Sequence, residues 1–309
     1  MATSVFVFTG FLDSGKTTAL QGSLLRRIDS EIGKAVIICT EEGDEEYKSN
    51  ELSEQGISIV NVEEPEDFTE EFLADIAEEY EPDRVFVEYN GVWNLKAFLD
   101  MTLPAGWYVT NVFGLVDAST YDMYLKNMRQ TIMEPLKEAD VILFNRCGEN
   151  FKKGETRRTL KLINNRAQIF FADMDGSVDD GVEELLLEDE SVSINVTEDI
   201  FCQWFIDCIE NTDKYYGKKV RFSAMVNKGS GLKESQFYIG RYAAICCEAD
   251  AQFVGFIAEY DGEIPKEGAW VLIEAEIQKG EIDGKQLIIL LKVQEMQIME
   301  KTENIYLYF

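Results

Sequence analysis

The sequence predicts an α/β domain with a mostly parallel sheet and helices on both faces, followed by a small all-β domain that is an OB-like barrel. Two patterns in the 309 residues lead to this prediction. Over about the first 170 residues, short apolar runs alternate with amphipathic segments, as in parallel sheets that are covered on both faces. Roughly the last 110 residues carry five strand-like runs and few helical patterns, which is typical of a small barrel.

The first domain is expected over residues 1–172. Its strand candidates include fully apolar runs such as VFVF at residues 5–8, which suit strands buried on both faces. Between the first two strands, Leu20, Leu24 and Ile28 recur every four residues, so this segment is expected to form an amphipathic helix. The seven predicted strands span residues 4–9, 35–39, 57–62, 84–88, 108–116, 140–145 and 168–171.

An acidic linker is expected at residues 173–197, because nine acidic residues and no basic one stand within residues 173–190. The second domain then spans residues 198–309 and begins with an apolar helix candidate at residues 199–211. Alternating apolar side chains in the runs that follow predict half-buried strands, and the DG dipeptide at residues 283–284 predicts a tight hairpin. These runs span residues 218–227, 236–245, 252–260, 269–279 and 285–298.

Composition and charge limit the partners that the chain can have. Lys and Arg number 29 against 58 Asp and Glu, which gives a net charge of −29. Such a surface repels phosphate backbones and anionic lipid, so binding to nucleic acid or to a membrane surface is not expected. No apolar run reaches the ~20 residues of a membrane span, and the amino-terminal residues do not follow a signal-peptide pattern. Because the six cysteines are thinly spread, the expected compartment is the cytoplasm.

The most specific motif is the glycine-rich segment GFLDSGKT at residues 10–17, which fits the phosphate-binding pattern G-x-x-x-x-G-K-[ST]. It follows an apolar strand and opens a helix, as a phosphate-binding loop does. Backbone N–H groups and Lys16 would bind the phosphates of a nucleoside triphosphate, and the Thr17 hydroxyl is placed to ligate Mg²⁺. The residues of this segment expected at the nucleotide are Gly10, Asp13, Ser14, Gly15, Lys16, Thr17 and Thr18.

The segment at residues 10–18, GFLDSGKTT, resembles the phosphate loop of the CobW-like metallochaperone GTPases, relatives of UreG and HypB. Three further segments resemble this family in the same order: VEYNG at residues 87–91, VDA at 116–118 and EADVILFN at 138–145. The resemblance covers about residues 1–170 and implies a P-loop GTPase domain that uses Mg²⁺.

The resemblance also implies roles for individual residues. Glu88 matches the glutamate of the family's E-x-x-G motif and would organise Mg²⁺ or its water, and the Gly91 backbone would sense the γ-phosphate. Glu41 stands where the family has N-E-F-G, so it either faces Mg²⁺ and water or belongs to a solvated acidic loop. The candidate catalytic residues are therefore Lys16, Glu88 and Glu41.

Two departures from the family pattern bear on specificity. Residues 61–65, NVEEP, replace the C-x-C-C motif, so the usual metal site is missing. The guanine-reading N-K-x-D becomes Asn145-Arg146-Cys147-Gly148, so the aspartate that accepts the guanine N–H groups has no counterpart at Gly148. Asn145 and Arg146 are still expected at the nucleotide, but the choice between GTP and ATP stays open.

The segment at residues 240–251, GRYAAICCEADA, resembles the C-terminal domain of YcgQ-type bacterial proteins, which typically accompany a predicted permease. The chain has no histidine, so a metal site must use carboxylates, thiolates, hydroxyls or water. Cys246, Cys247 and Asp250 could supply part of a Zn²⁺ site. Alternatively, one of the two cysteines is buried in the core and the other lies at a strand edge.

From these observations we expect a CobW-like GTPase that couples nucleotide hydrolysis to metal delivery or homeostasis, with zinc as the expected metal. Its expected partners are the nucleotide, a metal-dependent client protein or a membrane permease, and a second copy of the chain. Two alternatives stay open. One is a nucleotide-sensing regulatory subunit of a permease with little catalysis. The other is an ATP-using kinase or ligase.

Overall fold

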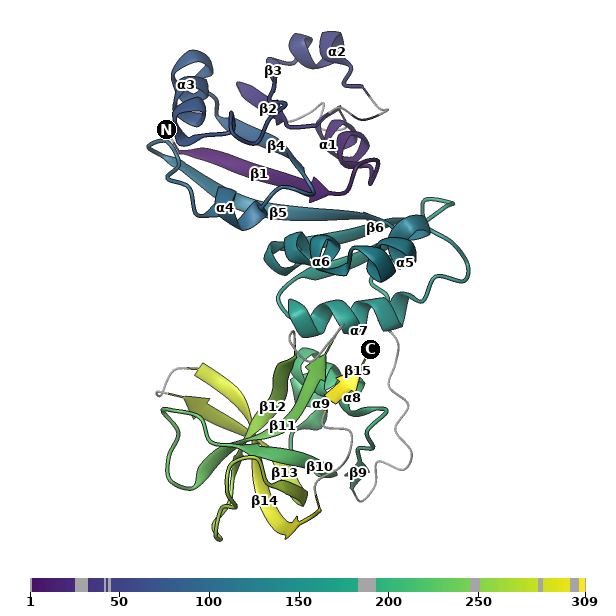
Figure 1. Cartoon of the computed structure of the whole chain (residues 1–309), viewed down its shortest axis with the longest axis vertical. Helices are drawn as coiled ribbons and strands as arrows, with labels where there is room; N and C mark the ends of the chain where they lie inside the picture. Colours follow the sequence, from purple (N-terminus) through teal and green to yellow (C-terminus); the bar gives the residue numbers. More distant parts are fainter. Residues whose placement is uncertain are drawn as a thin grey trace. The chain divides into compact units, whose positions relative to one another are not determined.

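The computed structural model describes residues 2–25, 33–41, 43, 46–182, 193–244, 251–282, 286–300 and 306–308. The chain divides into two compact units, Met1–Val182 and Glu183–Phe309 (Figure 1). The first unit is an α/β unit and the second is mostly β, so the predicted fold class is confirmed.

Within the described residues of the first unit, eight strands form one sheet in the order β3-β2-β4-β1-β5-β6-β7-β8. The pairs from β3 to β7 are parallel, and β8 is antiparallel to β7. The strands are β1 (Thr3–Gly10), β2 (Ala35–Cys39), β3 (Ile57–Asn61), β4 (Arg84–Asn90), β5 (Trp107–Asp117), β6 (Val141–Cys147), β7 (Gln168–Asp173) and β8 (Val178–Asp179). All seven predicted strands are present.

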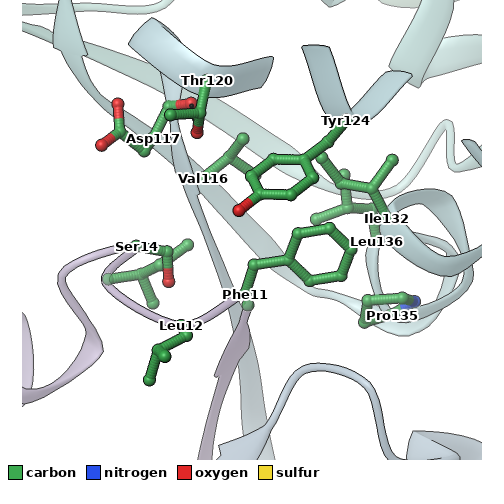
Figure 2. A pocket seen from close by; sticks show the side chains of 12 residues that line it. Phe11, Leu12, Ser14, Val116, Asp117, Thr120, Tyr124, Ile132, Pro135 and Leu136 are labelled. Atoms are coloured by element: carbon green, nitrogen blue, oxygen red, sulfur yellow. Dashed lines mark hydrogen bonds between the residues drawn. The ribbon is translucent and has the colours of Figure 1, made fainter. Parts of the chain in front are cut away.

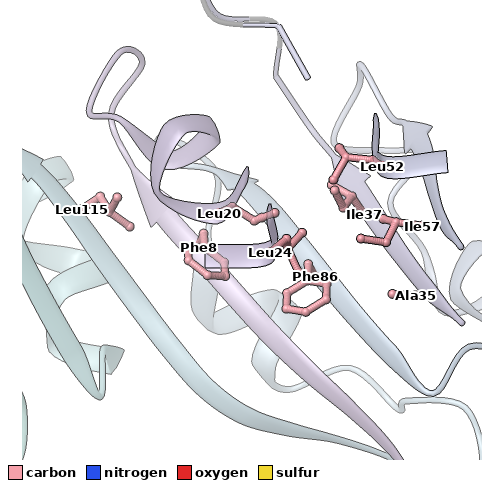
Figure 3. Close-up of a cluster of buried hydrophobic side chains, with 9 residues drawn as sticks. All are labelled: Phe8, Leu20, Leu24, Ala35, Ile37, Leu52, Ile57, Phe86 and Leu115. Carbon is pink, nitrogen blue, oxygen red and sulfur yellow. The ribbon is translucent and has the colours of Figure 1, made fainter. Parts of the chain in front are cut away.

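Helices cover both faces of this sheet. Val7 and Phe8 of β1 are consecutive and point to opposite faces, yet both are buried. Figure 3 shows Leu20 and Leu24 packed with Phe8 in one core cluster, as the helical periodicity predicts, while Ile28 lies outside the described residues. The helices are α1 (Lys16–Leu25), α2 (Ser49–Glu54), α3 (Glu70–Tyr80), α4 (Leu95–Leu99), α5 (Ala118–Asn127), α6 (Arg129–Glu138) and α7 (Lys153–Ile163).

The register of the parallel strands brings the sequence motifs to one edge of the sheet. Phe8 of β1 and Cys39 of β2 both lie level with Glu88 of β4. On the other side of β1, Asp117 of β5 lies level with Asn145 of β6. The motifs therefore converge at the carboxyl ends of the strands, where doubly wound sheets bind their ligands.

Five of the seven described strands of the second unit close into a barrel in the order β10-β11-β12-β14-β13-β10, which confirms the predicted barrel. The other two strands pair at its edges, β15 with β11 and β9 with β10. Side chains that alternate along β10, such as Phe222 and Ala224, fill its interior. Trp204 of α8 packs against Phe222 and against Phe256, with ring centroids 5.2 and 5.3 Å apart. The elements are β9 (Ile194–Asn195), α8 (Phe201–Glu210), α9 (Thr212–Tyr215), β10 (Lys219–Asn227), β11 (Gln236–Ala244), β12 (Gln252–Glu259), β13 (Trp270–Ile282), β14 (Gln286–Ile298) and β15 (Tyr306–Tyr308).

The acidic segment predicted as a linker contains ordered structure. After β7, the chain turns back and β8 pairs with it, so the first unit extends beyond residue 172 to Val182. Lys153 explains why this acidic hairpin folds, since its ammonium lies 2.8 Å from a carboxylate oxygen of Asp173 and 2.6 Å from one of Asp179. The predicted hairpin dipeptide at residues 283–284 lies outside the described residues.

Candidate nucleotide-binding site

The phosphate loop connects β1 to α1 through backbone conformations that require glycine. Gly10 has φ +147° and Gly15 has φ +88°. A Cβ atom at Gly10 would lie 2.1 Å from the Leu115 carbonyl oxygen, and one at Gly15 would lie 2.7 Å from Asn145 Nδ2. Asp13 also adopts a positive φ, +60°, and its side chain is exposed. The loop thus curls tightly at the end of β1 and leaves the Asp13 side chain exposed.

The loop residue Phe11 packs against apolar side chains of α5 and α6. Figure 2 shows Phe11 pointing toward Tyr124 of α5 and toward Ile132 and Leu136 of α6. The rings of Phe11 and Tyr124 meet edge to face with centroids 4.5 Å apart, a favourable aromatic geometry. The loop conformation is therefore fixed by packing on the side away from the predicted phosphate contacts.

Lys16 is buried and makes two contacts inside the loop and one with the segment after β2. Its Nζ donates to the carbonyl oxygens of Gly10 at 2.8 Å and of Phe11 at 2.9 Å, and it forms an ion pair with the Glu41 carboxylate. Burial raises the pKa of the Glu41 carboxyl, and Lys16 opposes this rise. The lysine that the motif assigns to phosphate binding is therefore paired with a carboxylate from the segment after β2.

Glu88, near the carboxyl end of β4, receives donors on both carboxylate oxygens. Thr17 Oγ1 donates to Glu88 Oε1 at 2.7 Å, and the Tyr47 hydroxyl donates to Oε2. The hydroxyl and the carboxylate are hard oxygen ligands, and Mg²⁺ is usually held by one or two protein groups together with phosphates and water. The pair Thr17 and Glu88 therefore fits a Mg²⁺ ion.

The segment after β4 is tied to the phosphate loop and to β2. Thr40 Oγ1 donates to the Glu88 carbonyl oxygen at 3.0 Å and accepts from the Asn90 N–H at 2.7 Å. At Gly91, an added Cβ atom would lie only 2.2 Å from the Gly10 carbonyl oxygen. Only glycine permits this approach of two backbones, so the phosphate loop and the segment after β4 are in direct contact.

Asn145 and Arg146, at the end of β6, contact the phosphate loop from the opposite side. Asn145 Nδ2 donates to the Ser14 carbonyl oxygen at 2.7 Å. Arg146 Nη1 donates to the Asp13 carbonyl oxygen at 2.9 Å and pairs with Asp117 Oδ2 at 2.5 Å. Burial works to raise the pKa of Asp117, but hydrogen bonds from the next turn and from Arg146 outweigh it and lower the pKa. The charged Arg146 guanidinium thus links Asp117 of β5 to the phosphate loop.

Open space surrounds position 148, where the family pattern has its guanine-reading aspartate. Gly148 follows β6, and no heavy atom lies within 4 Å of the place where its Cβ would be. Glu149, the next residue, is exposed. The structure therefore places no carboxylate at position 148, but it leaves room for one.

Residues from four separate segments surround one cavity of about 230 Å³ at the carboxyl edge of the sheet. A second, adjoining cavity of about 510 Å³ shares Leu12 and Glu41 with the first and extends toward Cys39, Asn61 and Glu63. The residues that line the first cavity are Leu12, Asp13, Gly15, Lys16, Thr17, Thr18, Glu41, Gly43, Glu88 and Arg146.

Two residues of the site were not identified from the sequence. Asp117 stands in the VDA segment but has no assigned role there, and it now pairs with Arg146. Tyr47 belongs to no motif and reaches Glu88 across 41 positions of sequence.

The metal site predicted in the second unit stays a prediction. Its expected zinc ligands, Cys246, Cys247 and Asp250, lie outside the described residues. Among the residues that the structure does describe, no cluster of three or more Cys, Asp or Glu side chains is arranged to hold a metal ion.

A comparison with protein families identifies the first unit. The family model described as the CobW/HypB/UreG nucleotide-binding domain matches residues 4–171. The chain belongs to this family. A second family model, the DUF1980 C-terminal domain, matches residues 176–309 of this CobW-family protein.

Relatives of both units are known. The UPF0703 protein YcgQ of Bacillus subtilis (strain 168) is 21% identical over 194 residues, which are 61% of this chain and 67% of that protein. Among solved structures, the hydrogenase maturation factor HypB from Archaeoglobus fulgidus is 17% identical, covers 68% of this chain and 90% of that chain, and has a TM-score of 0.40. The Zn(II)-bound YjiA GTPase from E. coli is 18% identical, with coverages of 94% and 89% and a TM-score of 0.42.

These comparisons confirm both resemblances that the sequence motifs indicate. In the part of the chain that the structure describes, no helix is both long enough and apolar enough to cross a membrane.

Proposed function

We propose that this CobW-family protein hydrolyses a nucleoside triphosphate with Mg²⁺, with GTP as the expected substrate, and couples the reaction to metal delivery or homeostasis. The observation that carries the proposal is the convergence of Lys16, Thr17 and Glu88 on one cavity at the carboxyl edge of the sheet. Family membership supports the nucleotide part of the proposal.

In this proposal the phosphate loop and Lys16 bind the phosphates, and Thr17 and Glu88 hold Mg²⁺. When bound, Mg²⁺ would help to neutralise the charge that develops on the phosphate oxygens. Lys16 must leave the Glu41 carboxylate to reach a phosphate oxygen, because the two now form an ion pair. Glu41 would then be free to orient an attacking water molecule together with Glu88.

We propose relaxed discrimination between GTP and ATP. Asn145 keeps its contact with the phosphate loop, but position 148 carries glycine instead of a carboxylate. A site without the hydrogen-bonding group that reads a base loses most of its power to reject the other base. Arg146 donates to the loop and lines the same cavity, and we expect its guanidinium to stack on the base.

The metal part of the proposal concerns the second unit. The C-x-C-C motif of the family is replaced by residues 61–65, NVEEP, in the first unit. We propose that Cys246, Cys247 and Asp250 supply thiolate and carboxylate ligands for Zn²⁺ in its place. A metal-dependent client protein would be the partner that receives the metal.

The likeness to YcgQ favours a second candidate function. In that case the nucleotide domain is a sensor that regulates a membrane permease, and turnover is negligible. Titration calorimetry with GTP and ATP, in Mg²⁺ with and without Zn²⁺, combined with a phosphate-release assay, separates the two functions. The GTPase proposal requires binding and turnover, whereas the sensor requires binding without turnover. Absence of binding would contradict both.

A further inference from the structure

Tyr47 lies between the switch-like segment after β2 and the start of α2, and its ring is fixed by the core. The ring packs against the apolar cluster that includes Leu20 and Leu24 of α1. Its hydroxyl reaches away from this cluster and donates to Glu88 Oε2. Because the ring is held by packing, the position of the hydroxyl oxygen is set by α1 and the sheet rather than by solvent.

The Glu88 carboxylate has no cation among its described contacts. Lys16, the buried lysine of the phosphate loop, pairs with Glu41 instead. Glu88 is only 3% exposed, and its donors are neutral. The Thr17 hydroxyl donates to Oε1, and Oε2 accepts from the Tyr47 hydroxyl and, at a long 4.0 Å, from the Cys39 thiol. A buried carboxylate depends on such donors, and loss of the Tyr47 hydroxyl would leave Oε2 with only the long, weak contact from the Cys39 thiol.

The two donors differ in what they can do. The Thr17 hydroxyl is itself the group that the P-loop motif assigns to Mg²⁺, so it is not available as a permanent support. The P-loop motif assigns no ligand role to the Tyr47 hydroxyl, and the packed ring keeps this hydroxyl in place as a donor to Glu88. Tyr47 is therefore the contact that can hold Glu88 in place while Thr17 changes partner.

We propose that Tyr47 is a positioning residue that fixes the Glu88 carboxylate in the orientation needed to hold Mg²⁺. This inference rests on the proposed function, since it names a residue that acts through the proposed Mg²⁺ ligand. It also links the segment after β2, which carries Glu41, to the metal side of the same cavity.

The test is the Tyr47→Phe variant, which keeps the ring and removes only the hydroxyl. The affinity for a fluorescent GTP analogue is measured in EDTA and across a Mg²⁺ titration. Affinity in EDTA is expected to stay within about twofold of wild type, while the Mg²⁺ concentration for half-maximal effect rises about tenfold, as expected for loss of a hydrogen bond to a charged group. A merely structural role would weaken binding equally with and without Mg²⁺, and that result would overturn the proposal.

A matched control is available in the second unit. Tyr215 is fully buried and its hydroxyl donates to the Asp207 carboxylate, so Tyr215→Phe removes the same kind of bond far along the chain from the site. This variant is expected to keep the wild-type Mg²⁺ dependence. A shift as large as that of Tyr47→Phe would show that loss of any buried tyrosine hydroxyl suffices, and it would overturn the proposal.

A double-mutant cycle shows whether Tyr47 acts through Glu88. Glu88→Gln is expected to raise the Mg²⁺ requirement, and adding Tyr47→Phe to it is expected to change the requirement by less than about twofold. Glu88→Asp keeps the charge but withdraws the carboxylate by one methylene, so it should mimic Tyr47→Phe even if that variant folds poorly. Full additivity of the two substitutions would overturn the proposal. Wild-type protein that binds no nucleotide would refute the proposed function itself, and Tyr47 would then have no Mg²⁺ site to serve.

Discussion

The ion pair between Lys16 and Glu41 predicts that Glu41→Gln increases nucleotide affinity. In the structure the lysine ammonium and the glutamate carboxylate are in contact, and their side chains are only 2% and 9% exposed. Solvent screens such a pair weakly, so breaking it opposes phosphate binding. A hydrogen bond to a charged group contributes about 1.5–3 kcal/mol, and glutamine retains part of it. Taking the lower value, the affinity for GTP with Mg²⁺ should rise about tenfold.

The same substitution separates binding from turnover. If Glu41 orients water, the phosphate-release rate at saturating GTP should fall while the affinity rises. Binding is measured by titration calorimetry, and turnover by phosphate release from the same preparation. Glu46→Gln is the matched control, because Glu46 is an exposed glutamate in the same segment and its replacement changes the net charge equally. A fall in affinity for Glu41→Gln, or an equal rise in the control, would refute the reasoning.

Three further predictions concern the base, the thiols and the metal. Gly148→Asp should raise the preference for GTP over ATP at least about tenfold in competition binding. Open space surrounds that position, and a carboxylate placed there can accept hydrogen bonds from the guanine N–H groups. An unchanged ratio of affinities would show that another group reads the base. Burial and the Glu88 charge raise the pKa of Cys39 to about 11. Alkylation of Cys39 should therefore be slow at pH 8 and should accelerate as the pH rises toward that value, which peptide mass mapping can follow. Glu88→Gln should speed this labelling, and equal rates would contradict the assigned cause. A Cys246→Ser/Cys247→Ser double variant should bind Zn²⁺ more weakly than wild type, with and without nucleotide. Equally weak Zn²⁺ binding by wild type and variant would show that these cysteines are not zinc ligands.

Patterns of local sequence were sufficient to predict most of the fold. Apolar runs of four to nine residues and the loop between Gly10 and Lys16 identify the strands and the phosphate site, because these features depend on neighbours in sequence. The acidic segment after residue 172 is predicted to be a linker, but its first residues turn back and pair with β7 as β8. Its fold depends on Lys153, whose contacts with Asp173 and Asp179 come from a helix 20 and more residues earlier.

The candidate site shows the same limit. Motifs find Lys16, Thr17 and Glu88 individually, and parallel register explains why they meet. Tyr47 has no such pattern, because its role comes from a tertiary contact that brings the segment before α2 against β4. The contact of Glu41 with Lys16 is likewise a tertiary one, and it belongs to neither sequence interpretation of that glutamate, as a residue facing Mg²⁺ and water or as part of a solvated acidic loop.

The central claim is that the loop between β1 and α1 binds the phosphates of a nucleoside triphosphate through Lys16. The most direct measurement is titration calorimetry of wild-type protein and Lys16→Ala with GTP and with ATP in Mg²⁺. A charge-assisted contact contributes about 1.5–3 kcal/mol, so the variant that lacks it should bind roughly 10- to 150-fold more weakly. Unchanged affinity in Lys16→Ala, or no binding of either nucleotide to the wild type, would contradict the account.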